Sequence, residues 1–350
     1  MRNQRRVWGG LLVAWATSFA AAQDPIAGLK NKGALDDNDR ATLRQWIERQ
    51  VTLVLADEPQ SASTAVLTLR TEFDGSTGYK EAFATEAARL VNDRLATAKD
   101  RPAAQLITFL STLNAIETHT TLVAAMRDSR AAVRAAAAVG LRTLRAKIAA
   151  APGDAVGQTL RALRDAGKSE TSPATLKLIY LALNYAGVNA DQKGPAVALV
   201  ELLEQRAREY TASGSPRCQN ADAEGLKIAT MARGQLDDDQ KKRLARAAAS
   251  MLKHSVETYS AEKLNEMRDK TATVAAIDRR NDIELLIETA ETTLREVLDV
   301  KEGPDITTAM RDGSAVAMRR QLVDWSEQKL EGALGQRYRP DEGEAAPAQP

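Results

Sequence analysis

Apolar residues recur at helical spacing over much of the chain, and the clearest example lies between His119 and Ile148. Leu122, Val123 and Met126 would share one face of a short helix. After a polar turn, a longer helix would bury Val133, Ala137, Leu141, Leu144 and Ile148. Two helices of this size cannot bury their apolar faces alone, so we expect neighbours of the same kind on both sides.

The same periodicity predicts helices along most of the remaining sequence. Acidic runs at 36–39 and 237–239 precede two of them, where carboxylates would cap free backbone N–H groups and suit the helix dipole. Proline stands near the start of several others, where its missing N–H costs nothing. The further predicted ranges are 61–73, 78–98, 102–116, 155–166, 173–185, 195–210, 221–232 and 272–300.

Alternating β-branched runs are almost absent, so the sequence predicts an all-α protein. We expect an α-solenoid of stacked helical hairpins over 36–235, with a polar lead at 23–35. A C-terminal helical region at 236–336 would pack on this array and close it with a longer helix pair. Apolar residues at heptad spacing mark that pair: Ile283, Ile287, Ala290, Leu294 and Val297. The Pro-, Ala- and Glu-rich tail at 337–350 is predicted to be disordered.

The pattern LxxxMxDxxxxxRxAAxxxL, which begins at Leu122, resembles a HEAT-type helical repeat of bacterial scaffold proteins. This resemblance implies structural roles for Asp128 and Arg134, which would link neighbouring repeats. Val133, Leu141 and Leu144 would form the core of the repeat. A second copy about forty residues later has no counterpart of Arg134, so we expect the ladder of charges to stop there.

The N-terminus has the pattern of a signal peptide. Three arginines precede an apolar stretch at 7–19 and three alanines at 20–22. We predict a Sec-type signal peptide at 1–22, cleaved after Ala22, and a periplasmic or extracellular protein. An uncleaved signal anchor is the alternative, although the apolar stretch is too short for stable transmembrane insertion.

Composition limits the chemistry that the chain can perform. Its two histidines, His119 and His254, are expected near a helix start and on a polar helix face, and no metal-ligand spacing surrounds them. Cys218 would lie in an exposed loop at 212–220. The segment 162–169, which ends in Gly167, Lys168 and Ser169, imitates the end of a phosphate-binding loop. Gly167 is better interpreted as the C-cap of a helix. We therefore predict no catalytic, cofactor-binding or metal-binding residue.

Charge is unevenly distributed along a chain whose formal net charge is only +1. Loss of the signal peptide would remove three arginines and no acid, giving −2, so a globally basic nucleic-acid binder is excluded. Between 127 and 168, nine basic residues face three acids, whereas eight acids face two bases between 282 and 305. The residues predicted to bind an anionic partner are Arg130, Arg142, Arg145, Arg161 and Arg164. Alternatively, these charges form an ordinary solvated surface.

Together these patterns predict an exported, non-catalytic binding or scaffolding protein that engages a protein or an anionic envelope partner through a solenoid surface. The alternative is an all-helical toroid that hydrolyses or cleaves glycans with paired carboxylates. Sugar clefts usually need aromatic platforms, yet several of the aromatic residues here fall at core positions. These are Trp46, Phe73, Phe83, Phe109 and Tyr180.

Overall fold

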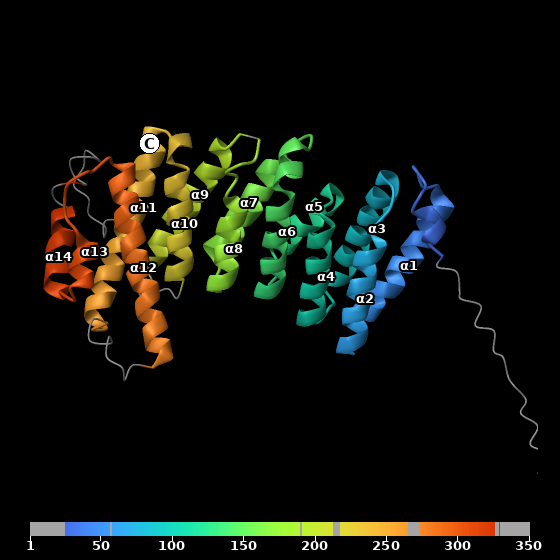
Figure 1. The fold of residues 1–350 in the computed structure, drawn as a ribbon, viewed down its shortest axis with the longest axis horizontal. Coiled ribbons are helices and arrows are strands. Elements are labelled where there is room, and N and C mark those ends of the chain that lie inside the picture. Colours follow the sequence, from blue (N-terminus) through green and yellow to red (C-terminus); the bar gives the residue numbers. More distant parts are fainter. Residues whose placement is uncertain are drawn as a thin grey trace, which may run out of the picture.

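The computed structural model of the protein describes residues 25–56, 58–189, 191–212, 218–264, 273–325 and Lys329. Within those ranges it contains fourteen α-helices, three short 3₁₀-helices and no β-strand. Most of the α-helices follow one another side by side in an elongated array (Figure 1). The fold is an all-α solenoid of stacked helical hairpins.

Twelve helices form six consecutive hairpins. These are α1 (Asp37–Leu55) with α2 (Pro59–Glu72), α3 (Thr77–Leu95) with α4 (Asp100–Leu113), α5 (His119–Ala125) with α6 (Ala131–Ala150), α7 (Ala155–Lys168) with α8 (Pro173–Leu183), α9 (Lys193–Ala212) with α10 (Gln219–Met231), and α11 (Asp238–Ala261) with α12 (Val274–Val297). The short helices α13 (Ile306–Arg311) and α14 (Ala315–Asp324) follow. The 3₁₀-helices are η1 (Ala27–Leu29), η2 (Ile116–Thr118) and η3 (Arg233–Gln235).

The hairpins stack in two layers, because most helices pack on the helix two positions further along the chain. We call α1, α3, α5, α7, α9 and α11 the odd layer and the other six, from α2 to α12, the even layer. The outer surfaces of these layers are the odd face and the even face. The long pair α11–α12 closes the array, and α13 and α14 pack on its end through α12 and α11.

One hydrophobic core runs through the whole array. Val133, Leu141 and Leu144 are each at most 1% exposed, which confirms their predicted place in the core of the third hairpin. In α12 the predicted heptad stripe is buried from Ile283 to Leu294. The helical phase deduced from the sequence is therefore correct in both regions.

Both acidic runs cap helices as predicted. Asp36 accepts a hydrogen bond from the backbone N–H of Asp39, at 2.8 Å, and the Asp39 carboxylate accepts one from the N–H of Asp36. Asp237 and Gln240 make the same reciprocal pair at the start of α11. Each pair satisfies two backbone donors that a helix start leaves free.

The prediction for Gly167 is wrong. This residue lies inside α7, and Ser169 is the C-cap. A Cβ atom at position 167 would lie 2.7 Å from the Leu202 side chain, so the glycine allows α7 and α9 to approach closely.

The predicted exposed loop at 212–220 is also wrong at its C-terminal end. Cys218 is only 3% exposed and occupies the N-cap position of α10, whose first residue is Gln219. Residues 213–217 lie outside the described ranges, as do the predicted signal peptide with its cleavage site at Ala22 and the tail at 337–350. None of the described helices combines the length and the apolar character needed to span a membrane.

Candidate partner-binding face

The two histidines occupy structural positions. His119 begins α5 and is buried, with its Nε2 atom 2.8 Å from the Thr159 hydroxyl. His254, expected on a polar helix face, is half-buried, and its ring centroid lies 5.2 Å from that of Tyr210. Burial lowers the pKa of both imidazoles. Among the described residues, no group of three potential ligands is placed to hold a metal ion.

A buried polar cluster links the middle hairpins. Asp222, with no exposed surface, accepts hydrogen bonds from the hydroxyls of Tyr180 and Tyr210 at 2.7 and 2.9 Å. It also pairs with Arg206 of α9, at 3.2 Å. Burial and the neighbouring carboxylate raise the pKa of both tyrosines well above 10, so both remain proton donors.

The same cluster continues the ladder of charges beyond the point where the sequence predicts its end. Glu170 is 1% exposed and receives two hydrogen bonds from Arg134, at 2.8 and 2.9 Å. Arg206 donates to the backbone carbonyl of Glu170, so the ladder runs from α6 through α9 to Asp222 in α10. The missing counterpart of Arg134 comes from α9, which local sequence comparison does not reveal.

Arg130, predicted to bind a partner, serves the fold instead. Its side chain pairs with Asp128 at 2.6 Å and donates to the carbonyls of Leu95 and Ala98 in the preceding hairpin. Arg134 reaches the following hairpin. Asp128, Arg130 and Arg134 thus connect three successive hairpins, which agrees with the structural roles expected for Asp128 and Arg134.

The five predicted partner-binding arginines do not form one face, because α6 and α7 belong to different layers. Arg161 pairs with Asp154 at 2.6 Å, and Arg164 of α7 pairs with Glu201 of α9. Arg142 and Arg145 lie on α6 in the even layer. Only these last two have no carboxylate partner within the described part of the chain.

Arg142 and Arg145 differ in their surroundings. Arg142 is exposed, whereas the guanidinium of Arg145 is half-buried and lies 6.0 Å from the centre of the Tyr185 ring. Burial, followed by the charge of Arg142, lowers the pKa of Arg145. Burial raises the pKa of Tyr185 to about 12. The Arg145 side chain therefore packs beside Tyr185, whereas Arg142 presents its charge to solvent.

The odd face carries interleaved charges that neutralise one another. Arg44 of α1 pairs with Glu86 of α3 at 2.8 Å, and Arg94 of α3 pairs with Glu48 of α1 at 3.1 Å. Arg243 of α11 pairs with a carboxylate of α9. Such crossed pairs make the odd face an ordinary solvated surface.

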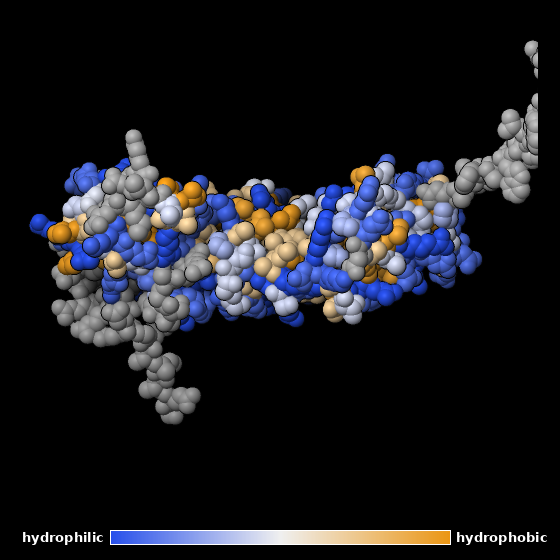
Figure 2. All heavy atoms as spheres, turned by 90° about the horizontal axis from the view of Figure 1, so that it is seen from below, coloured by the Kyte–Doolittle hydropathy of each residue, from blue (hydrophilic) through white to orange (hydrophobic). Residues whose placement is uncertain are grey.

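The even face is different. In α2, α4, α6 and α8, the only acid at an exposed position is Asp100, in the first turn of α4. The exposed cations of these four helices are Arg70, Arg101, Arg142, Lys147 and Lys177. Serine, threonine and alanine fill most of the other exposed positions. The edge of the array that faces down in Figure 1, where helices end, also shows pale and apolar side chains over its middle (Figure 2).

Exposed large apolar side chains also gather on the even layer. Leu67 of α2 is 64% exposed, Val139 of α6 is 41%, Met231 of α10 is 59% and Leu285 of α12 is 41%. Within the described residues, the odd helices expose only one such side chain, Leu53 of α1. A surface poor in charge, with separate apolar side chains, loses little hydration when it is covered.

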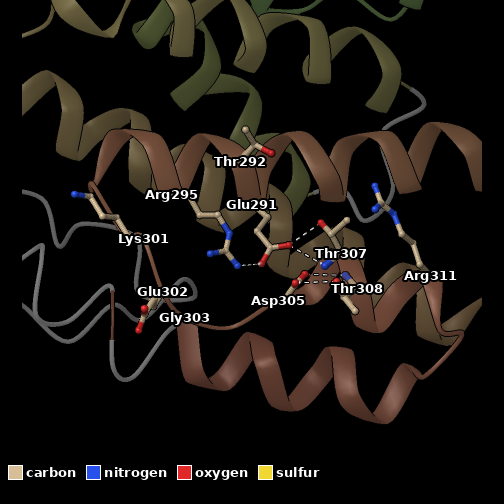
Figure 3. Close-up of a pocket in the computed structure, with 10 residues that line it drawn as sticks. All are labelled: Glu291, Thr292, Arg295, Lys301, Glu302, Gly303, Asp305, Thr307, Thr308 and Arg311. Atoms are coloured by element: carbon tan, nitrogen blue, oxygen red, sulfur yellow. Dashed lines mark hydrogen bonds and ion pairs between the residues drawn. The ribbon is translucent and has the colours of Figure 1, made fainter.

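A polar pocket of about 590 Å³ lies between α12 and α13 (Figure 3). Its buried carboxylate, Glu291, accepts hydrogen bonds from the backbone N–H groups of Ile306 and Thr307 and from the indole N–H of Trp325. Arg295 pairs with it at 3.3 Å. Because these donors occupy both carboxylate oxygens, Glu291 holds α13 and α14 against α12 and is not free for catalysis.

Sugar-binding platforms are not evident on the described surface. Every described aromatic side chain is buried except that of Phe73, which is partly buried and packs edge-on against Phe83. No observation therefore favours the glycan-active alternative. Comparison with known protein families finds no matching family model, and no characterised protein matches the sequence.

Proposed function

We propose that the protein is an exported, non-catalytic binding or scaffolding protein of the HEAT type, and that its even face engages an anionic partner. The observation that carries the proposal is the difference between the two faces. On the odd face cations and acids are interleaved and several of them pair, whereas the even face, from α2 to α8, exposes cations with almost no acid.

The small side chains and isolated cations of the even face favour binding. Small side chains lose little conformational entropy when they are covered, and isolated cations attract a partner of opposite charge during encounter. A solenoid can offer such a surface without a catalytic group. Export rests on the signal-peptide pattern at 1–22 and places the partner in the envelope or outside the cell.

Arg142 provides the direct test. Replacing it with glutamate reverses one exposed charge on the even face and disturbs no ion pair described in the structure. We expect the Arg142→Glu variant to lose at least about tenfold in affinity for partners captured from envelope extracts of the native host. Crosslinking and mass spectrometry would identify these partners, and the wild-type interaction should weaken as salt rises.

Arg49 offers a matched control. It is also exposed, lies on α1 of the odd layer and has no ion-pair partner among the described residues. Arg49→Glu should leave capture unchanged, and both variants should keep the helical melting curve of the wild type. Arg145 is unsuitable, because its reversal would bury a carboxylate against Tyr185. Unchanged capture by Arg142→Glu, with the same salt dependence, would refute the proposal.

A further inference from the structure

The array separates two surfaces of opposite charge on one side of the molecule. Exposed positions of α6 and α8 hold Arg142, Lys147 and Lys177 and no acid. Those of α12 hold Asp278 and Glu296 and no cation, and the half-buried Glu288 lies between them; Glu288 pairs with Arg311 of α13 and Glu296 with Arg233 of η3. Both surfaces belong to the even face, with α10 between them. They therefore cannot meet within one rigid copy of the chain.

We propose that the even face binds a second copy of this chain, with α6 of one copy facing α12 of the other. The inference rests on the proposed function and names the partner of the same face. The two copies would be related by a two-fold axis that runs parallel to the helices and passes between α8 and α10. Each contact then occurs twice, as in an isologous interface.

The heights of residues on neighbouring helices of the even layer support this arrangement. Thr175 of α8 donates to the carbonyl of Ala131 in α6, and Tyr180 of α8 donates to Asp222 of α10. Thr230 of α10 meets Thr293 of α12 at 2.8 Å. Counting along parallel helices from these contacts places Arg142 at a height between Glu288 and Glu296, to within about one turn.

The same arrangement also brings apolar side chains of the two copies opposite one another. On this register Val139 of α6 and Leu285 of α12 lie within about one helical turn of each other in height, and each is 41% exposed. A two-fold axis parallel to the helices preserves height, so each valine would face a leucine of the other copy. Lys177 of α8 would likewise face Glu224 of α10, with which it makes only a distant pair of 3.9 Å within its own chain.

The existing partners of the α12 acids do not prevent the contact. Glu288 pairs with Arg311 and Glu296 pairs with Arg233, but both pairs are exposed to solvent. Such surface pairs are weak and exchange readily.

The overlap is large enough for a specific dimer. Four helices about 9 Å apart and about 18 Å long cover roughly 650 Å² on each copy, or about 1,300 Å² in total, which is at the lower end of specific interfaces.

Sedimentation velocity of the exported chain provides the test. The wild type should dimerise at micromolar concentration in about 50 mM salt and dissociate when salt reaches about 500 mM. Arg142→Glu and Glu288→Arg should each raise the dimer dissociation constant at least about tenfold, because each places like charges opposite one another. An equimolar mixture of the two variants should restore the wild-type affinity, since both contacts then pair opposite charges again.

Leu285→Ser is a second variant that alters no ion pair, and it should also weaken the dimer. Melting curves show whether each variant remains folded. A wild-type chain that stays monomeric in low salt at about 100 µM would overturn the inference. So would a dimer that responds neither to salt nor to these substitutions. If Arg142→Glu still loses capture of a different protein, the proposed function stands and only the identity of the partner is wrong.

Discussion

Asp222 shows how single residues hold this solenoid together. Its carboxylate is fully buried, yet it accepts hydrogen bonds from two tyrosine hydroxyls and pairs with one guanidinium. Buried charges persist when every lone pair is satisfied, because removing one partner leaves an uncompensated charge. Sequence reasoning missed this cluster, since Tyr180, Arg206 and Asp222 lie on three different helices and share no local pattern.

His119 gives the protein a testable dependence on pH. Because burial lowers its folded-state pKa below 6.5, the unfolded chain binds a proton before the folded chain does. Stability from this residue is therefore complete above pH 6.5 and is lost as pH falls from there through the lower folded-state pKa. His254 contributes in the same direction.

We expect His119→Gln to reduce the fall in melting temperature between pH 7.5 and pH 5.5, because glutamine can still bond to Thr159 and does not titrate. His254→Gln should reduce it by a separate amount, and the double variant should flatten it further. Thermal melts followed by circular dichroism measure the effect. A slope that the double variant leaves unchanged would contradict this account.

At the scale of whole elements, local sequence signals predicted the helices and their caps far better than the contacts between helices. The caps at Asp36 and Asp237 were predictable, because a capping box involves only residues within one turn. The two-layer arrangement was not, and neither was the inward position of Gly167. For the candidate face, Arg142 is exposed on α6, but the predicted grouping with Arg161 and Arg164 fails because α7 belongs to the other layer.

Close approach between helices depends on glycine at a few positions. A Cβ atom on Gly225 of α10 would lie 2.7 Å from the ring of Tyr180, whose hydroxyl is fixed by Asp222. Gly225→Ala should therefore destabilise the protein by about 1–3 kcal/mol in urea unfolding, despite the better helix propensity of alanine. Gly194→Ala is the control, because its nearest contact would be 3.7 Å, and it should be neutral or stabilising. Equal effects of the two substitutions would contradict the packing argument.

At the scale of the whole molecule, the array turns a nearly neutral sequence into a polarised one. Cations and acids lie together on the odd helices, whereas in the even layer the exposed cations of α2 to α8 lie apart from the exposed acids of α12. Pairs such as Arg44 with Glu86 cross between odd helices and neutralise one face. The even face keeps exposed cations on α2 to α8 and exposed acids on α12. The net charge of the chain does not show this division, whereas the arrangement of the helices does.

The central claim is that the even face is the binding surface, and site-specific photo-crosslinking in the native host tests it most directly. Thr143 of α6 and Thr85 of α3 are matched sites: both are exposed, and each hydroxyl bonds to the carbonyl four residues earlier, at 3.0 and 2.8 Å. A photoreactive benzophenone side chain at position 143 should yield a discrete adduct with a second protein or a second copy, whereas position 85 should yield none. Equal adducts at both positions, or an adduct from position 85 alone, would contradict the claim.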